Sequence, residues 1–307
     1  MLSCQPVCQT LKRSGAVVVL GLAFSLLVGQ ARPGHTQQAD PLSEAYALYR
    51  LGDLGQAVSL LQNLVQQQPQ NLQVQLLLGV SLSERAQGQD LPDALIAFRH
   101  AQTLDPKNFL AWFGEGEVLA AQKRPQMARH AFERALAIRP GDPATETELG
   151  RLQLQLRKAR VAQAYFEAAL RADNGYLPAH YELGRLLLRR GQTNEALAHF
   201  QESINGPDYA EGQLGMGLCL QALGKLSDAI DHYHWALAID PQLWEAHLAL
   251  GQILAQQAAL GHPELREPAA DHLQAVLQAQ PGNKAAKQAL RSLRRLPKPA
   301  GPGGTAA

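Results

Sequence analysis

The chain has 307 residues, of which 46% are hydrophobic, 18% are charged and 6% are aromatic, and its formal net charge is +1. This apolar content is enough to bury a core, and the charged fraction is too low for a disordered chain. The near-neutral balance does not favour nucleic acid or an anionic membrane as the partner of the whole chain.

The first segment, residues 1–31, has the pattern of a secretory signal peptide. Lys12 and Arg13 precede the apolar run 16–28, and Gly29 and Ala31 supply the small residues that a signal peptidase reads. The run is shorter than the roughly 18–20 residues that a spanning helix needs. We therefore expect export to a periplasmic or other extracytoplasmic compartment, with an uncleaved N-terminal anchor as the alternative. Residues 32–37 are expected to be a linker.

A three-residue pattern recurs along the rest of the chain. An alanine returns at intervals of 33 to 40 residues, followed four positions later by a large apolar or aromatic residue. A small or apolar residue follows three positions after that. Offsets of four and seven lie on one face of a helix, so each triplet predicts a buried stripe. The recurring alanines are Ala57, Ala94, Ala128, Ala162, Ala196, Ala229 and Ala269.

Glycines and prolines recur in phase with these alanines. Glycine inside a helix costs roughly 1 kcal/mol relative to alanine, so repeated glycines indicate close contact between two helices. Prolines twelve residues after the alanine are expected to end the second helix of each unit. The glycines are Gly79, Gly116, Gly150, Gly184, Gly217 and Gly251, and the prolines are Pro69, Pro106, Pro140, Pro241 and Pro281.

Together these features resemble the tetratricopeptide repeat, a helix–turn–helix unit of about 34 residues. The unit with Trp112, Gly116, Ala128, Phe132 and Pro140 shows the pattern most fully. The resemblance implies an all-α solenoid, a right-handed superhelix in which each unit packs on its neighbours. Residues 284–296 are expected to form a capping helix and residues 297–307 a disordered tail. Seven repeats are expected at 38–71, 72–108, 109–142, 143–176, 177–209, 210–243 and 244–283.

Motifs for catalysis, cofactors or metals are missing from the sequence. Gly114 and Gly116 lack the third glycine of a dinucleotide fingerprint, so they are interpreted as helix-contact residues. His232 and His234 are two residues apart and point in different directions on a helix, so they do not form a chelating pair. Cys219 is expected to be a small core residue. We therefore expect no enzyme, no cofactor and no metal, and we interpret the histidines as surface or groove polar groups.

The resemblance also implies that the first helix of each unit lines a concave groove that holds a peptide or a partner helix. Some residues in phase with the groove are expected to pack between units instead. Arg151 and Arg185 occupy equivalent positions and are either solvated or in contact with an anion or acidic peptide. The groove candidates are Tyr46, Tyr49, Leu76, Val80, Phe113, Glu117, Arg151, Leu154, Tyr181, Arg185, Leu214, Leu218, Leu248 and Gln252.

The function predicted from these features is that of an exported, non-catalytic scaffold or adaptor in the assembly of an extracytoplasmic complex. Its partners are expected to be proteins, without nucleic acid, and it would touch a membrane only through an uncleaved N-terminal segment. The alternative is a structural, self-associating or membrane-tethered component of the cell envelope.

Overall fold

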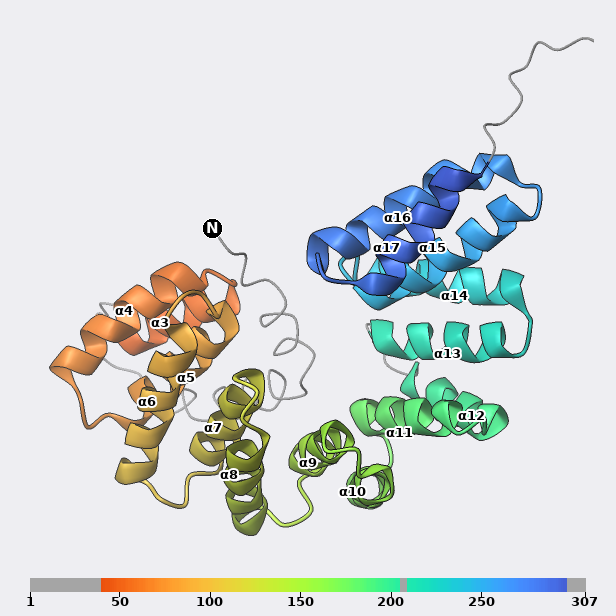
Figure 1. Ribbon diagram of the computed structural model, residues 1–307. Helices are drawn as coiled ribbons and strands as arrows, with labels where there is room; N and C mark the ends of the chain where they lie inside the picture. Colours follow the sequence, from red (N-terminus) through yellow and green to blue (C-terminus); the bar gives the residue numbers. More distant parts are fainter. Residues whose placement is uncertain (1–39, 205–208, 297–307) are drawn as a thin grey trace, which may run out of the picture. The chain divides into compact units, whose positions relative to one another are not determined.

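The computed structural model describes residues 40–204 and 209–296, which are helices joined by turns (Figure 1). No strand occurs in these two ranges, so the predicted all-α fold is confirmed. The predicted signal peptide, linker and tail lie outside the described residues. The helices are α3 (Pro41–Arg50), α4 (Leu54–Gln67), α5 (Leu72–Arg85), α6 (Asp90–Leu104), α7 (Phe109–Ala121), α8 (Pro125–Ile138), α9 (Pro143–Gln155), α10 (Ala159–Ala172), α11 (Leu177–Arg189), α12 (Thr193–Ser203), α13 (Ala210–Ala222), α14 (Leu226–Ile239), α15 (Trp244–Ala259), α16 (Arg266–Ala279) and α17 (Lys284–Arg295), with a short 3-10 helix, Pro263–Leu265, before α16.

Successive helices pack in pairs, α3 with α4, α5 with α6 and so on to α15 with α16, with α11 and α12 joined where Tyr181 and Gly184 meet Phe200. First helices of neighbouring pairs also contact each other, as α3 contacts α5, α5 contacts α7 and α13 contacts α15. The contacts divide the chain into two compact units, Met1–Ala179 and His180–Ala307. Each unit is thus a stack of helix pairs, and the first helices of the pairs lie on the same side of the stack.

Prolines end several second helices at one fixed position. α4 and α6 end two residues before Pro69 and Pro106. The residue between is not helical, with φ −133° and ψ 63° at Gln68 and φ −141° and ψ 94° at Asp105. A proline disfavours the helical conformation of the residue before it. The helix end is therefore set locally by the sequence, as predicted.

Side-chain caps start many of the first helices. Asn71 Oδ1 accepts from the backbone N–H of Val74, and Asn108 Oδ1 accepts from that of Ala111. Asp142 caps α9 in the same way. Such a cap contributes about 1 kcal/mol to helix stability.

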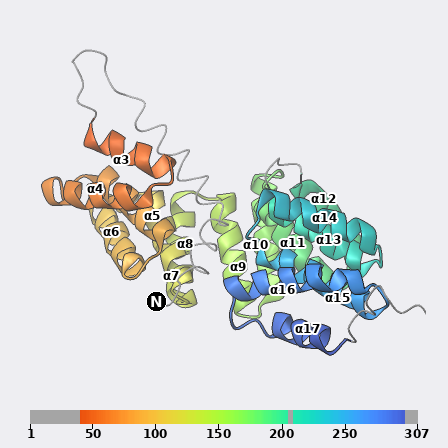
Figure 2. The same ribbon diagram turned by 90° about the horizontal axis from the view of Figure 1, so that it is seen from above.

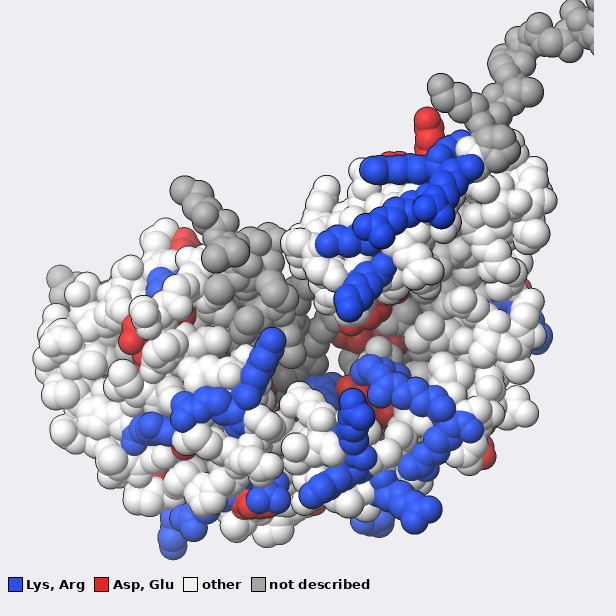
Figure 3. Space-filling model, in the orientation of Figure 1, with Lys and Arg blue, Asp and Glu red and all other residues white. Residues whose placement is uncertain are grey.

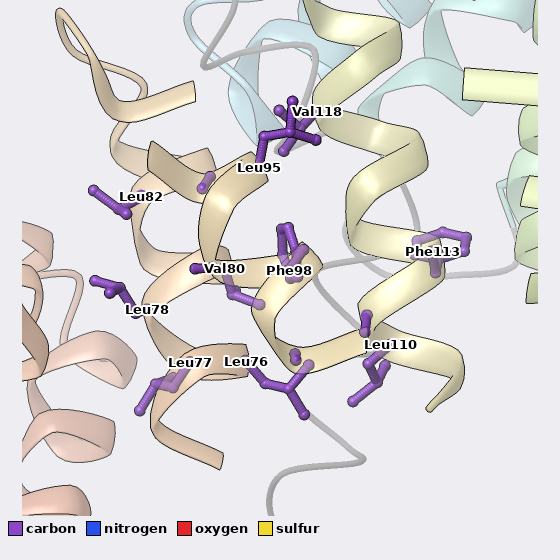
Figure 4. Close-up of a cluster of buried hydrophobic side chains, with 14 of the residues drawn as sticks. Leu76, Leu77, Leu78, Val80, Leu82, Leu95, Phe98, Leu110, Phe113 and Val118 are labelled. Atoms are coloured by element: carbon purple, nitrogen blue, oxygen red, sulfur yellow. The ribbon is translucent and has the colours of Figure 1, made fainter. Parts of the chain in front are cut away.

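The recurring glycines admit aromatic rings between the helices. A Cβ built on any of the six pattern glycines would lie 2.4 to 2.9 Å from a side chain of its own second helix. The ring of Phe98 in α6 is held from two sides, because a Cβ on Gly79 would come within 2.8 Å of it and one on Gly114 within 2.4 Å. Figure 4 shows this ring at the centre of the cluster, with Val80 beside it. The prediction that these glycines are helix-contact residues is confirmed.

The capping helix is also present. Ala286, Leu290 and Leu293 of α17 are buried, and α17 packs on α15 and α16 at the end of the stack (Figure 2). Within the described ranges, no helix combines the length and apolar character needed to cross a membrane.

Candidate protein-binding face

Tyrosines and glutamates from successive first helices gather on one face of the first unit. Tyr46 and Tyr49 of α3 stack with ring centroids 6.4 Å apart, and the Tyr49 hydroxyl donates to Glu84 Oε1 of α5 at 2.5 Å. Glu117 of α7 acts electrostatically on Tyr49. Burial, followed by the charge and hydrogen bond of Glu84, raises the pKa of Tyr49 far above its usual value. This hydroxyl is therefore a permanent hydrogen-bond donor at any physiological pH.

The same face continues to α9 and to the turn before α11. Tyr176 lies in that turn, and burial raises its pKa, with Glu148 adding to the rise and Arg151 opposing it. The charge of Glu117 contributes to the raised pKa of this tyrosine, as it does for Tyr49, so Glu117 of α7 lies between the two ends of the face. We call this set the first-helix face of the first unit, and it consists of Tyr46, Tyr49, Glu84, Glu117, Glu148, Arg151 and Tyr176.

The second unit repeats this combination of residue types. The ring of Tyr181 in α11 packs on Phe200 and edge-on against Tyr209, with centroids 5.8 and 6.1 Å apart. Arg185 Cζ lies 5.4 Å from the centre of the Tyr181 ring, a cation–π distance. Burial raises the pKa of Tyr181, Arg185 opposes the rise, and Glu182, Glu211 and Glu245 add to it. Glutamates thus outnumber arginines around the tyrosines of both units. The first-helix face of the second unit consists of Tyr181, Glu182, Arg185, Tyr209, Glu211 and Glu245.

Both arginines that the sequence singled out are paired within their own helix. Arg151 Nη1 donates to Glu148 Oε1, and Arg185 Nη1 donates to Glu182 Oε2 at 3.3 Å. In each case the glutamate precedes the arginine by three residues, which places both on one helix face. The pairing weakens the hypothesis of an anion contact, because each positive charge already faces a carboxylate.

Several predicted groove residues are core residues instead. Phe113 is fully buried, with its ring centroid 5.5 Å from those of Phe109 and Phe132, and Figure 4 shows it pointing away from Phe98. Helix phase alone does not separate a residue that faces the groove from one that faces the next helix pair. The candidates buried in the core are Leu76, Val80, Phe113 and Leu214, whereas Glu117 and Tyr181 are also largely buried but belong to the tyrosine–glutamate clusters described above. The half-buried candidates are Tyr46, Tyr49, Arg151, Leu154, Arg185, Leu218 and Leu248, and Gln252 is exposed.

The sequence did not predict several other members of the two faces. Glu84 lies one turn beyond the predicted position in α5, and Tyr176 lies in a turn that helix phase does not cover. Glu148 and Glu182 carried a usable signal, because both precede an arginine by three residues at the same place in consecutive repeats. Reading glutamate and arginine together would have identified these pairs.

Histidines form cross-helix pairs that the sequence reading also missed. His180 Nδ1 lies 3.0 Å from His199 Nδ1, and His247 Nδ1 lies 2.8 Å from His272 Nδ1. The first member of each pair stands four residues before a pattern glycine and the second three residues after a pattern alanine. His199, His247 and His272 are half-buried and His180 is buried, so these histidines also link the two helices of one pair, a role that the sequence did not predict.

The tautomers of the second pair follow from its neighbours. His247 Nε2 lies 3.1 Å from the Pro241 carbonyl oxygen, which only accepts, so Nε2 donates. Neutral His247 then accepts at Nδ1 the hydrogen of His272 Nδ1. Burial, followed by the nearby His247 and His234, lowers the pKa of His272 to about 4, although Asp271 opposes the shift.

This pair predicts a loss of stability in acid. The unfolded chain takes up a proton at His272 near its ordinary pKa of about 6.5, whereas the folded chain takes it up only near pH 4. Stability contributed by neutral His272 is therefore complete above pH 6.5 and is lost as the pH falls toward 4. Because the ring is half-exposed, we expect an effect of about 1–2 kcal/mol after screening by solvent.

Urea unfolding at pH 7.5 and 4.5 tests this pH dependence. The free energy of unfolding should fall less between the two pH values for His272→Gln than for the unchanged chain. The same drop in both would contradict the assignment, and His130→Gln, at an exposed site, is the control.

The described residues also include a free cysteine and a polar-lined pocket. Across the two described ranges, no three His, Cys, Asp or Glu side chains are arranged to hold a metal ion. Cys219 is buried, and burial raises the pKa of its thiol to about 11, so it is the core residue that was predicted. A pocket of about 610 Å³ between α6, α7 and α8 includes Trp112 and His130. The polar side chains that line this pocket bond to one another, because Glu115 accepts hydrogen bonds from Arg99 at 2.9 Å and from Gln102 at 2.6 Å.

Stacked helix pairs whose first helices share one face define a helical repeat protein. The chain belongs to the tetratricopeptide repeat family. A family model described as "Tetratricopeptide repeat" matches residues 42–109, 83–143 and 147–210, and one described as "TPR repeat" matches residues 217–257. A search of curated proteins finds no match.

Solved structures of other repeat proteins share this fold. The crystal structure of the APC/C hetero-tetramer Cut9–Hcn1 contains a chain similar over 93% of the present one, with a TM-score of 0.70 and 21% identity. The match covers 54% of that chain, so the present protein spans about half its length. A tetratricopeptide repeat protein from Parabacteroides merdae matches over 83% of this chain and 97% of its own, with a TM-score of 0.63 and 19% identity. PilW, a type IV pilus biogenesis factor, matches over 68% and 96%, with a TM-score of 0.57 and 21% identity.

Proposed function

We propose that this protein is a non-catalytic scaffold that binds a peptide or a helix of a partner protein on its first-helix faces. The observation that carries the proposal is the gathering of tyrosines and charged groups from four successive pairs on one side of the first unit. Family membership supports it, because tetratricopeptide repeats generally serve protein–protein interaction. The chain of similar fold in the Cut9–Hcn1 structure is part of a hetero-tetramer.

The chemistry of the face indicates what it would hold. Tyr46 is half-buried, and so is Leu154, which follows Arg151 by three residues and therefore lies on the same side of α9. A partner can still remove apolar surface from water at both residues, at about 25 cal/mol per Å². Tyrosine is among the residues that contribute most to interfaces. Three glutamates against one arginine favour a partner segment with basic side chains next to apolar ones.

Photo-crosslinking tests the binding face directly. A photoreactive phenylalanine analogue at Tyr46 should give one dominant adduct with another protein in living cells. The matched control replaces Tyr165, a half-buried tyrosine on the second helix α10, and should give no such adduct. Adducts of equal yield from both sites would overturn the proposal. Adducts only between copies of this chain would favour the self-associating structural component instead.

The binding contribution of the face has a quantitative test. Tyr46→Ala combined with Leu154→Ala should weaken binding of the crosslinked partner by about tenfold or more, because both remove apolar contact area. Thermal unfolding of the double variant shows whether the fold is kept. Unchanged affinity in a folded variant would exclude this face as the binding site.

We further propose that the protein acts in an extracytoplasmic compartment, in the assembly of a protein complex. The support is the N-terminal sequence, with Lys12 and Arg13 ahead of the apolar run 16–28 and small residues at Gly29 and Ala31. The intact mass of the protein purified from its native cells tests this directly. A chain that begins at Arg32 agrees with export and cleavage, and an intact N-terminus would favour the membrane-tethered alternative.

A further inference from the structure

The capping helix α17 carries a concentrated positive charge in an almost neutral protein. It contains five basic residues and no acidic one, whereas the whole chain has 28 basic and 27 acidic residues. All five side chains are exposed, and Figure 3 shows lysines and arginines gathered over this helix. We call them the α17 stripe, which consists of Lys284, Lys287, Arg291, Arg294 and Arg295.

The five charges lie along one line of the helix. Their spacing of three, four, three and one residues keeps them within an arc of about 100° at 100° per residue. The opposite side of α17 is fixed to the protein through Ala286, Leu290 and Leu293, which are buried. The stripe is therefore about 16 Å long at 1.5 Å per residue and points away from the core.

No partner within the described residues neutralises the stripe. Ion pairs of the described residues include those of Arg85, Arg99, Arg129, Arg151, Arg185 and His262, and none involves a residue of α17. Five like charges on one helix repel each other, at a cost of about 0.2–0.5 kcal/mol for each pair one turn apart. An anionic partner would remove this repulsion on binding.

The residues next to the five charges indicate which kind of anionic partner the stripe would bind. Amphipathic helices that dock on membranes use an apolar face, but the leucines Leu290 and Leu293 are buried in the protein. Binding of single-stranded nucleic acid relies on aromatic side chains for stacking, and α17 has none. The stripe has neither a free apolar face nor aromatic side chains, and its charges recur at helical spacing. Its charges are therefore complementary to a second helix whose acidic residues recur every three or four positions.

We propose that the α17 stripe is a docking surface for an acidic helical segment of a partner protein. This site is separate from the first-helix faces, whose glutamates would repel such a segment. The protein would thus offer two contact surfaces of opposite preference, one for basic and one for acidic segments.

Fluorescence anisotropy with designed peptides tests the proposal on the full chain. One alanine-based helical peptide carries glutamates at spacings of three and four residues, and a second has the same composition with the glutamates spread around the helix. In 50 mM NaCl, about 0.05 M ionic strength, surface charges are weakly screened, and we expect the striped peptide to bind about tenfold more tightly than the spread one. Equal binding of the two peptides would overturn the geometric basis of the proposal.

Matched charge reversals locate the site. Lys287→Glu with Arg291→Glu should weaken binding of the striped peptide by about tenfold or more, because attraction becomes repulsion at two positions. Arg50→Glu with Lys107→Glu makes the same change in net charge at two other exposed cations and should leave affinity within about twofold. Equal losses in both variants would show a response to net charge alone and would contradict the site.

Two further probes separate the competing anions and the two surfaces. Phosphatidylglycerol vesicles and a single-stranded 20-mer oligonucleotide should each bind more weakly than the striped peptide, and tighter binding of either would reassign the stripe to lipid or nucleic acid. The Tyr46→Ala, Leu154→Ala variant should bind the striped peptide normally. Loss of binding in that variant would place the peptide on the first-helix face and overturn the proposal, whatever the outcome for the natural partner.

Discussion

Replacement of Ala128 by leucine should lower the free energy of unfolding by about 1–3 kcal/mol, because it adds three carbon atoms to a fully packed site. Ala128 has no exposed surface, and its helix α8 packs directly against α7. Its Cβ belongs to the stripe that recurs in every predicted repeat, so the leucine would force these two helices apart. Urea unfolding followed by circular dichroism measures the loss.

The control for this change lies two residues earlier. Gln126 is exposed on the same helix, so Gln126→Leu introduces the same side chain without displacing any neighbour. Its effect should stay within about 0.5 kcal/mol, as for most surface substitutions. If both variants unfold at the same urea concentration, the assignment of Ala128 to the helix–helix contact is wrong.

Replacement of Gly114 by alanine should also destabilise the protein by about 1–3 kcal/mol, although alanine is the better helix former. The new Cβ would lie 2.4 Å from Cζ and 2.5 Å from Cε1 of Phe98. The ring has no room to retreat, because Gly79 holds it from another side with a corresponding distance of 2.8 Å. The steric cost therefore exceeds the gain of about 1 kcal/mol in helix propensity.

A second glycine distinguishes packing from propensity. Gly55 lies in the first turn of α4, where a Cβ would meet only Asp53 Oδ1, at an ordinary 3.7 Å. Gly55→Ala should therefore stabilise the protein by up to about 1 kcal/mol, since alanine has the higher helix propensity. Opposite signs for the two substitutions, measured by thermal unfolding, are the expected result. Stabilisation by both would show that the Phe98 ring is not confined as described.

The local part of the architecture was predictable from the sequence. The prolines end their helices because they act on the residue directly before them, and the alanine stripes form because residues four and seven apart share a helix face. The contact glycines could be identified because a costly residue recurred in phase with those stripes. These features depend on neighbours a few residues away along the chain.

The candidate binding face was only partly predictable. Tyr46, Tyr49, Glu117 and Arg151 were placed in the correct helices, but Phe113 belongs to the core. A side chain on a first helix can face the groove, the second helix of its own pair or the next helix pair. The periodicity of one helix does not distinguish a residue that faces the groove from one that faces the next pair. The sequence therefore predicted Leu154 and Phe113 equally as groove residues, although Leu154 is half-exposed and Phe113 is fully buried.

Contacts between helices decided the remaining features. Tyr49 and Glu84 are 35 residues apart, and His247 and His272 are 25 apart, yet each pair is joined by a short hydrogen bond. The sequence by itself determined the helix pairs, their ends and the stripes that hold them together, because these follow from local periodicity. Only the tertiary structure decided which polar groups meet across helices, because such meetings depend on how neighbouring helices are rotated and spaced.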